Sequence, residues 1–256
     1  MYKIEDIINK IHCFDCLTFM KEMEDKSVDL TITSPPYDNL RDYKGYTFNF
    51  EGIAKQLYRI TKDGGVVVWV VGDATIKGSE TGTSFKQALY FKEIGFNLHD
   101  TMIWVKTGQG AVGSIYSYWQ NFEYMFILSK GKLKTFNPIE DRKNYACERW
   151  ANGGRDKTGQ SKSRRWVKSE DFGKRFNVWK ITPQCESEHP APFPKKLAED
   201  HILSWSNEGD IVLDPMCGSG TTCKMAQNLK RKYIGIEISQ EYCKIAKQRL
   251  MQKPLL

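Results

Sequence analysis

The sequence has no long hydrophobic run. Its longest unbroken apolar stretch is Val66–Val71, far short of the roughly 20 residues that a membrane-spanning helix needs. No basic region followed by an apolar stretch opens the chain, so no secretory signal peptide is predicted. The seven cysteines are odd in number and irregular in spacing, which argues against a disulfide framework and for a reducing compartment. These absences predict a cytoplasmic protein with no membrane partner.

Recognisable metal and phosphate sites are also scarce. Cys13 and Cys16 lie three positions apart beside His12, but no second close pair of ligands accompanies them, so we predict no metal site. The pattern Gly-x-x-x-x-Gly-Lys-Ser/Thr is absent, and a P-loop is therefore not supported.

The chain does carry an excess of positive charge, and that excess is local. Its 256 residues have a net charge of +7 and suit one large domain or two small ones. The segment Lys130–Arg175 holds 14 basic and six acidic residues, a net charge of +8. Tyr145, Trp150, Trp166 and Phe172 interleave with these cations, a combination that suits phosphates and bases. The segment indicates a nucleic-acid partner, with a solvated basic insertion as the alternative.

Outside that segment, short apolar runs alternate with helical stripes. The predicted strands are Ile8–Phe14, Val28–Thr33, Gly65–Val71, His99–Val105, Glu123–Leu128, Ile211–Leu213 and Lys232–Ile236. Apolar residues at helical spacing predict helices around 53–60, 197–205 and 242–250. Seven strands joined by crossover helices predict an α/β fold with a largely parallel sheet, whose ligands gather at the carboxyl ends of the strands.

The first chemical motif is Ser34-Pro35-Pro36-Tyr37, directly after the strand predicted at Val28–Thr33. Consecutive prolines must end the strand because neither can donate to a ladder. The Ser34 hydroxyl and the Pro35 carbonyl can together accept hydrogen bonds from an exocyclic amine, and the Tyr37 ring can stack on the base that bears it. A rigid turn with no chemical role is the alternative.

The second motif joins a strand, a Gly-x-Gly turn and a helix. Asp214-Pro215-Met216-Cys217-Gly218-Ser219-Gly220-Thr221-Thr222 follows Ile211–Leu213, and glycine lets backbone approach a ligand closely. The next strand ends at Glu237, where a carboxylate is well placed to hold both hydroxyls of a ribose. The pair of features predicts a nucleotide-type site.

Together these blocks resemble the signatures of amino-group DNA methyltransferases, which use S-adenosylmethionine. The catalytic block precedes the Gly-x-Gly block, with the basic segment between them, and this order resembles the β class of that family. Supporting resemblances are Phe14-Asp15-Cys16, Glu123–Lys130 and His189–Pro194. The match spans nearly the whole chain outside Asn137–Asn177.

The resemblance implies a Rossmann-like seven-stranded, mostly parallel sheet with helices on both faces and a basic target-recognition insertion. The catalytic half would be 1–136, the insertion 137–177 and the S-adenosylmethionine-binding half 178–256. The implied catalytic residues are Ser34, Pro35, Pro36 and Tyr37. The implied cofactor-binding residues are Asp15, Cys16, His189, Phe193, Asp214, Met216, Cys217, Gly218, Ser219, Gly220, Thr221 and Glu237. The expected DNA-binding residues are Arg41, Lys143, Arg149, Arg155, Lys162, Arg164, Arg165 and Trp166.

The resemblance also bears on the target base, which would be flipped out of the duplex. The form with Ser34 is associated more often with N4-cytosine methylation, so we favour N4 of cytosine, with N6 of adenine as the alternative. C5-cytosine methylation is rejected because that family places its nucleophile in a Pro-Cys pair, and none of the nine prolines here precedes cysteine.

Some alternatives stay open. The expected partner is double-stranded DNA, and a homodimer and a cognate restriction endonuclease are both compatible with the sequence. A catalytically inactive DNA-binding protein on the same fold is a more remote alternative. Methylation of RNA or of a protein amide is disfavoured, because those relatives usually place the Gly-x-Gly block first in the chain.

Overall fold

The chain forms two compact units. The computed structural model describes residues 2–36, 48–108, 116–145, 148–151, 158, 160, 165–183 and 193–252, with backbone only at 148–151 and 165–167. The larger unit combines Met1–Asn137 with Asn177–Leu256, and the smaller unit is Pro138–Phe176. The smaller unit covers nearly the same residues as the insertion expected at 137–177.

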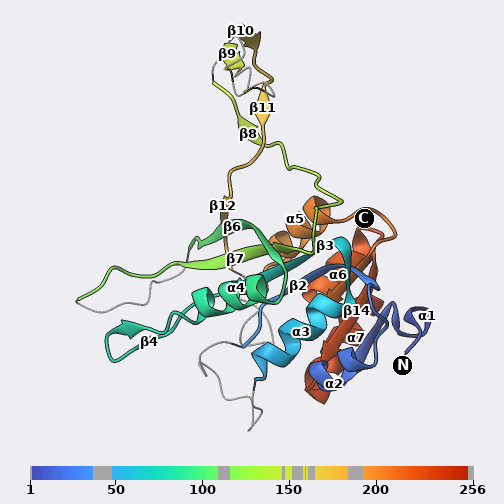
Figure 1. The fold of residues 1–256 in the computed structure, drawn as a ribbon. Helices are drawn as coiled ribbons and strands as arrows, with labels where there is room; N and C mark the ends of the chain where they lie inside the picture. Colours follow the sequence, from blue (N-terminus) through green and yellow to red (C-terminus); the bar gives the residue numbers. More distant parts are fainter. Residues whose placement is uncertain are drawn as a thin grey trace. The chain divides into compact units, whose positions relative to one another are not determined.

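An eight-stranded sheet forms the centre of the larger unit (Figure 1). Its strand order is β1-β14-β13-β2-β3-β7-β6-β12. Neighbours run parallel except where β7 pairs with β3 and with β6. The bounds are β1 (Lys10–Cys13), β2 (Val28–Thr33), β3 (Thr61–Val71), β6 (Asn97–Lys106), β7 (Phe122–Ser129), β12 (Val178–Ile181), β13 (Ile211–Asp214) and β14 (Lys232–Glu237).

Helices cover both faces of this sheet. Successive side chains of a strand point to opposite faces: Val66, Val68 and Val70 join one hydrophobic cluster, whereas Val67 and Trp69 join another. The first cluster includes residues of α5 (Lys195–Trp205), α6 (Thr221–Asn228) and α7 (Gln240–Met251). The second includes residues of α1 (Ile4–Ile7), α2 (Cys16–Lys21), α3 (Phe50–Ile60) and α4 (Thr83–Glu93). Burial on both sides explains the unbroken apolar run in β3.

The predicted α/β fold is confirmed, with one strand more than expected. All seven predicted strands are present, and β12 adds an eighth that pairs in parallel with β6 at the edge of the sheet. The sequence pattern did not reveal β12, because this strand is four residues long, alternates exposed with buried positions and directly follows the basic segment. None of the helices in the part of the chain that is described has the length and apolarity that crossing a bilayer requires.

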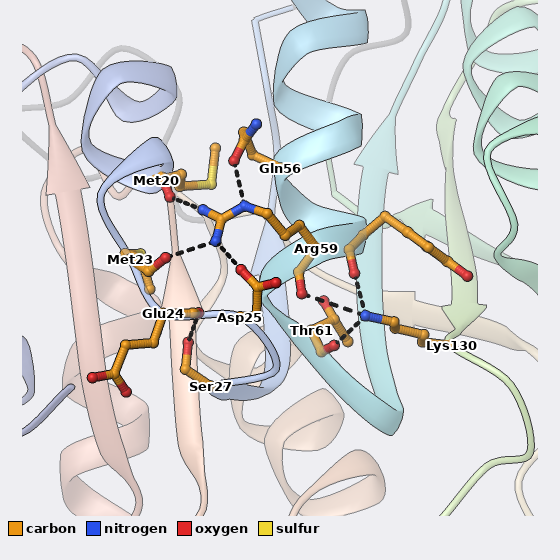
Figure 2. Close-up of polar contacts among 10 residues, drawn as sticks. Met20, Met23, Glu24, Asp25, Ser27, Gln56, Arg59, Thr61 and Lys130 are labelled. Atoms are coloured by element: carbon orange, nitrogen blue, oxygen red, sulfur yellow. Dashed lines mark hydrogen bonds and ion pairs between the residues drawn. The ribbon is translucent and has the colours of Figure 1, made fainter. Parts of the chain in front are cut away.

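Two cations organise the amino end of β3, at the edge of the sheet opposite the strand carboxyl ends (Figure 2). Lys130 Nζ donates to the carbonyl oxygens of Tyr58 at 2.6 Å and Thr61 at 2.9 Å, where α3 ends and β3 begins. The Arg59 guanidinium donates to the carbonyl of Met23 at 2.7 Å and to the carboxylate of Asp25. Cations at a helix carboxyl end satisfy carbonyls that have no partner within the helix. Lys130 is 9% exposed, so it belongs to the core of the larger unit and not to a basic surface.

The described residues of the smaller unit form two short antiparallel pairs. β8 (Arg142–Lys143) pairs with β11 (Phe172–Gly173), and β9 (Glu148–Ala151) pairs with β10 (Arg165–Lys168). An ion pair between Arg175 and Asp141 joins the two ends of the unit. Pro138–Phe176 contains 11 basic and six acidic residues, a net charge of +5.

Two further β elements, β4 (Thr75–Ile76) and β5 (Ser79–Glu80), form a small hairpin in the larger unit.

Candidate active site

The carboxyl ends of four neighbouring strands gather the main sequence motifs. β1, β14, β13 and β2 are adjacent and parallel, and neighbouring strands lie about 4.8 Å apart. The register pairs Cys13 with Glu237, Asp214 with Gly235, and Leu213 with Thr31. Segments far apart in the sequence therefore meet at one edge of the sheet, where α/β proteins bind ligands.

The Ser34-Pro35-Pro36 segment leaves the sheet directly after β2. Pro35 is buried, whereas Ser34 and Pro36 are half-buried, so the turn is held by packing as well as by the fixed φ of proline. Thr33, the last residue of β2, is buried too, which ties the start of the turn to the core. Tyr37 and Arg41 lie outside the described residues.

Glu237 closes the Gly-x-Gly turn through its carboxylate. Oε2 accepts a hydrogen bond from the backbone N–H of Gly218 at 2.8 Å, and Oε1 accepts one from the N–H of Ser239 at 2.9 Å. Each oxygen retains a further lone pair, because a carboxylate accepts about four hydrogen bonds. The side chain thus fixes the turn and can still accept bonds from hydroxyl groups of a ligand.

The turn itself lies tightly against α7. Gly220 has a φ of +78°, and a Cβ added to it would lie 2.8 Å from Cβ of Ala246. The Thr221 hydroxyl accepts a hydrogen bond from Arg249 at 2.7 Å, so this expected cofactor residue directs its hydroxyl toward α7. We did not anticipate Arg249, Ala246 or Ser239. Ala246 faces Gly220, and Arg249 donates to Thr221, which lies 28 residues earlier in the chain. Contacts between such distant residues leave no signal in the local sequence.

Asp214 is the most perturbed carboxyl group of the site. It is 6% exposed, and its Oδ1 accepts a hydrogen bond from the backbone N–H of Met216 at 3.2 Å. Burial raises the pKa of Asp214 to about 6, and the charge of Glu237 acts in the same direction. Perturbed carboxyl groups at strand ends are typical of functional sites.

The Asp15 carboxylate caps a helix. Its Oδ1 accepts hydrogen bonds from the backbone N–H of Thr18 at 2.8 Å and from the Thr18 hydroxyl at 2.7 Å, at the start of α2. Beside it, burial and the Asp15 charge raise the pKa of Cys16 to about 12. The neighbouring Cys223 thiol together with burial raises the pKa of Cys217. These cysteines are thiols at neutral pH and not nucleophilic thiolates.

The remaining expected site residues divide into two groups. Phe193 is half-buried and packs against the cluster that contains α5, α6 and α7, while His189 lies outside the described residues. Lys143 lies on β8, with Nζ 5.8 Å from the ring centroid of Tyr145. Arg149 lies on β9, and Arg165 and Trp166 lie on β10. Arg155, Lys162 and Arg164 lie outside the described residues.

No group of three potential ligands that could hold a metal ion occurs in the part of the chain that is described. His12, which suggested a metal motif together with Cys13 and Cys16, places its Nε2 2.9 Å from the carbonyl oxygen of Ile7. Burial lowers the pKa of His12 below its ordinary value. The arrangement at this edge of the sheet therefore offers carboxylates, glycine backbone and a hydroxyl as its chemical groups.

Comparisons with known proteins agree on one family. A family model described as DNA methylase matches residues 28–248. The chain is 57% identical over 248 residues to the orphan methyltransferase M.BamHII of Bacillus amyloliquefaciens, covering 90% of this chain and 92% of that protein. It is 29% identical to the type II methyltransferase M.BglII of Bacillus subtilis, covering 96% and 70% of the two chains.

Solved structures share the fold. The PvuII DNA methyltransferase, described as cytosine-N4-specific, superposes with a TM-score of 0.70 at 19% identity, covering 96% of this chain and 87% of that one. A DNA modification methylase of Thermus thermophilus in complex with S-adenosyl-L-methionine superposes with a TM-score of 0.66 at 22% identity, covering 94% and 92%.

Proposed function

Since the chain belongs to the DNA methylase family and is an S-adenosylmethionine-dependent DNA amino-methyltransferase of the β class, we propose that its target is N4 of cytosine in double-stranded DNA. The observation that supports methyl transfer to an exocyclic amine is the juxtaposition of Ser34-Pro35-Pro36 with Asp214 and Glu237 at adjacent strand ends. The choice of cytosine rests on the resemblance, in which the motif form with Ser34 is associated more often with N4-cytosine methylation, and N6 of adenine is the alternative target.

The residues present fit the cofactor. S-adenosylmethionine supplies a methyl group on a positively charged sulfur, together with a ribose, an adenine and an amino-acid end. Glu237 has lone pairs for two ribose hydroxyls beyond its bonds to Gly218 and Ser239. Asp214 offers a buried carboxylate for a positively charged group, and the glycine turn leaves backbone open to a close approach. Asp15 already accepts two hydrogen bonds from Thr18 at the start of α2. A contact with the adenine would therefore use the remaining lone pairs of its carboxylate.

The catalytic residues orient an amine. We propose that the Ser34 hydroxyl and the Pro35 carbonyl accept the two hydrogen bonds of the exocyclic amino group. These bonds favour a pyramidal nitrogen and free its lone pair from the base ring. The reaction then depends on positioning and electrostatics, without a strong base or a covalent adduct. The raised pKa values of Cys16 and Cys217 agree with a mechanism that uses no thiolate.

The target base must leave the duplex, because its amino group is otherwise paired and stacked. We propose that Tyr37 stacks on the flipped base and that residues around His189 cover the methionine end of the cofactor. Both residues lie outside the described part of the chain, so these roles rest on the resemblance of their motifs. Replacing Tyr37 with alanine tests the first role through the DNA KM.

The smaller unit is the proposed target-recognition region. Its net charge of +5 supports contacts with phosphates, which make DNA affinity steeply dependent on salt. We expect replacement of Arg155, Arg164 and Arg165 with alanine to weaken DNA binding and to lower the slope of log affinity against log salt by about two to three. S-adenosylmethionine affinity should stay unchanged, and equal loss of both affinities would contradict this assignment.

The partners are proposed from relatives and substrate. M.BamHII is named an orphan methyltransferase, which supports action without a cognate restriction endonuclease. A homodimer stays a prediction that sedimentation of the purified protein can test. A DNA substrate supports the proposed cytoplasmic location.

The deciding experiment is direct. Purified protein, labelled S-adenosylmethionine and unmethylated DNA of varied sequence are incubated, and the digested nucleosides are analysed by mass spectrometry. N4-methylcytosine supports the proposal, and N6-methyladenine supports the alternative target. Binding of DNA with neither product would indicate an inactive DNA-binding protein on this fold.

A further inference from the structure

Three large aromatic side chains stand exposed on the connection between β6 and β7. Tyr116 is 92% exposed, Tyr118 101% and Trp119 67%. We call Tyr116–Trp119 the aromatic segment. Tyrosine and tryptophan carry large apolar surfaces that folded proteins usually bury, and several exposed together indicate a binding surface.

The aromatic segment lies at the same end of the sheet as the candidate active site, where β2 and β3 have their carboxyl ends and β7 begins. β2 pairs with β3 up to Thr33 and Trp69, and β3 pairs with β7 up to Val71 and Tyr124. The start of β7, just after the aromatic segment, therefore lies two strands from the catalytic segment. At about 4.8 Å per strand, the sideways separation is roughly 10 Å. Phe122 also lies four residues along β7 from Phe126, the residue level with Thr33, which adds about 13 Å. The start of β7 therefore lies roughly 16 Å from Thr33. Figure 1 shows β6 and β7 running side by side toward this connection.

The base of the connection is firmly held. Lys106 N–H donates to the carbonyl of Asn121 at 2.7 Å, and Lys106 Nζ forms an ion pair with the buried Glu123 at 2.5 Å. The hydroxyl groups of Thr107 and Thr182 lie 2.9 Å apart, joining the ends of β6 and β12. These contacts fix the points from which the aromatic segment projects.

The chemistry of the connection favours bases over a protein surface. Residues 107–122 contain no charged side chain, so they neither repel phosphates nor attract them. Every base presents a flat π-face, and aromatic side chains stack on such faces with little regard to sequence. Gln120 and Asn121 follow directly, and their amides can bond base edges or the sugar backbone. Aromatic residues are enriched at protein interfaces too, but the place of the segment at the end of the sheet that carries the catalytic motif favours DNA as its occupant.

We propose that Tyr118 and Trp119 stack on DNA bases close to the target nucleotide. The separation of roughly 16 Å corresponds to about five base pairs at about 3.4 Å each. Stacking there would stabilise the distortion that accompanies extrusion of the target base. This inference rests on the proposed function, because it takes DNA as the substrate.

The test compares a double variant, Tyr118→Ala with Trp119→Ala, with a matched control that keeps an aromatic ring at both positions, Tyr118→Phe with Trp119→Phe. Both positions are exposed, so both variants should fold, and circular dichroism verifies this. We expect the alanine variant to bind DNA at least about tenfold more weakly. Its salt slope should equal that of the wild type because no phosphate contact is lost. The control should retain most of the affinity, and S-adenosylmethionine affinity should be unchanged in both variants.

A second readout locates the contact. DNA with 2-aminopurine at single positions within about eight base pairs of the target should report a change in fluorescence with the wild type and the control, and a smaller one with the alanine variant. Unchanged DNA affinity and unchanged fluorescence in the alanine variant would overturn the proposal. Loss of self-association in sedimentation, with DNA affinity intact, would overturn it by assigning the segment to a protein interface. Failure of the wild type to methylate any DNA would refute the proposed function, whereas the binding comparison would still test stacking.

Discussion

Cofactor affinity should depend on pH through Asp214. Burial raises the pKa of this carboxyl group to about 6, so in the free protein it is ionised at about pH 7.5 and mostly protonated at about pH 5. A cation placed beside a carboxylate favours the ionised form. S-adenosylmethionine carries positive charge on its sulfur and its amino group. We therefore expect binding to bring the pKa of Asp214 back to its ordinary value of about 4.

The size of the effect follows from these two values. At about pH 5 the free protein must lose the Asp214 proton in order to bind, and the linkage relation gives an affinity about tenfold lower than at about pH 7.5. This corresponds to about 1.4 kcal/mol. Isothermal titration calorimetry at the lower pH, in two buffers of different ionisation enthalpy, should detect release of about 0.8 proton for each cofactor bound.

Asp214→Asn provides the control. The variant should bind S-adenosylmethionine more weakly at about pH 7.5, but its affinity should vary little between that pH and about pH 5. The same affinity at both pH values in the wild type, or the same pH dependence in both proteins, would refute the reasoning.

The stability of the free protein offers an independent check. Because the folded pKa lies above the unfolded one, Asp214 lowers stability above about pH 6, and this penalty of about 3 kcal/mol disappears as the pH falls toward about 4.

Three further predictions concern single side chains. Ser34→Ala should lower kcat by about 100-fold, since it removes one of two oriented acceptors, and should leave the cofactor Kd unchanged in a titration; an unchanged kcat would exclude the proposed role. Glu237→Gln replaces one acceptor oxygen with a donor facing a backbone N–H, so we expect S-adenosylmethionine to bind about 10- to 100-fold more weakly in calorimetry. Lys130→Met leaves the carbonyls of Tyr58 and Thr61 without their donor. We expect this change to lower the thermal midpoint by about 5–10 °C with cofactor affinity unaffected in the folded protein, and a midpoint within about 1 °C of wild type would contradict the role of Lys130.

The strands and the edge that holds the site could be predicted because their signals are local. Consecutive apolar residues predict a strand buried on both faces, and Ser34, Asp214 and Glu237 each stand at or directly after the end of such a strand. Parallel strands place their carboxyl ends together, so these residues had to meet once the fold class was known. The motif order predicts which half of the chain carries which task, and that assignment stays a prediction.

Side-chain partners could not be predicted in the same way. The bond from Arg249 to Thr221 depends on how α7 packs on the Gly-x-Gly turn, and the helix cap formed by Asp15 competes with its expected role. Charge counting failed at Lys130, which we included in the basic segment. A lysine that donates to buried carbonyls cannot be distinguished from a solvated one by composition. The eighth strand, β12, did not stand out because it has only four residues and Lys180 interrupts its apolar run.

The pairing of β13 with β2 also affects how the protein is made. Val212 and Leu213 pair with Leu30 and Thr31, and the Asp29 carboxylate accepts a hydrogen bond from the N–H of Ile211, 182 residues later in the chain, at 3.0 Å. During synthesis, the first strand of this pair is complete long before the second, and closing so long a loop is slow. A nascent or truncated chain that ends before β13 therefore carries the residues proposed to orient the amine but exposes an apolar strand edge, which is prone to aggregation. We therefore expect the exposed edge of β2 to be covered, and the candidate site to be completed, in the same step, when β13 and β14 dock.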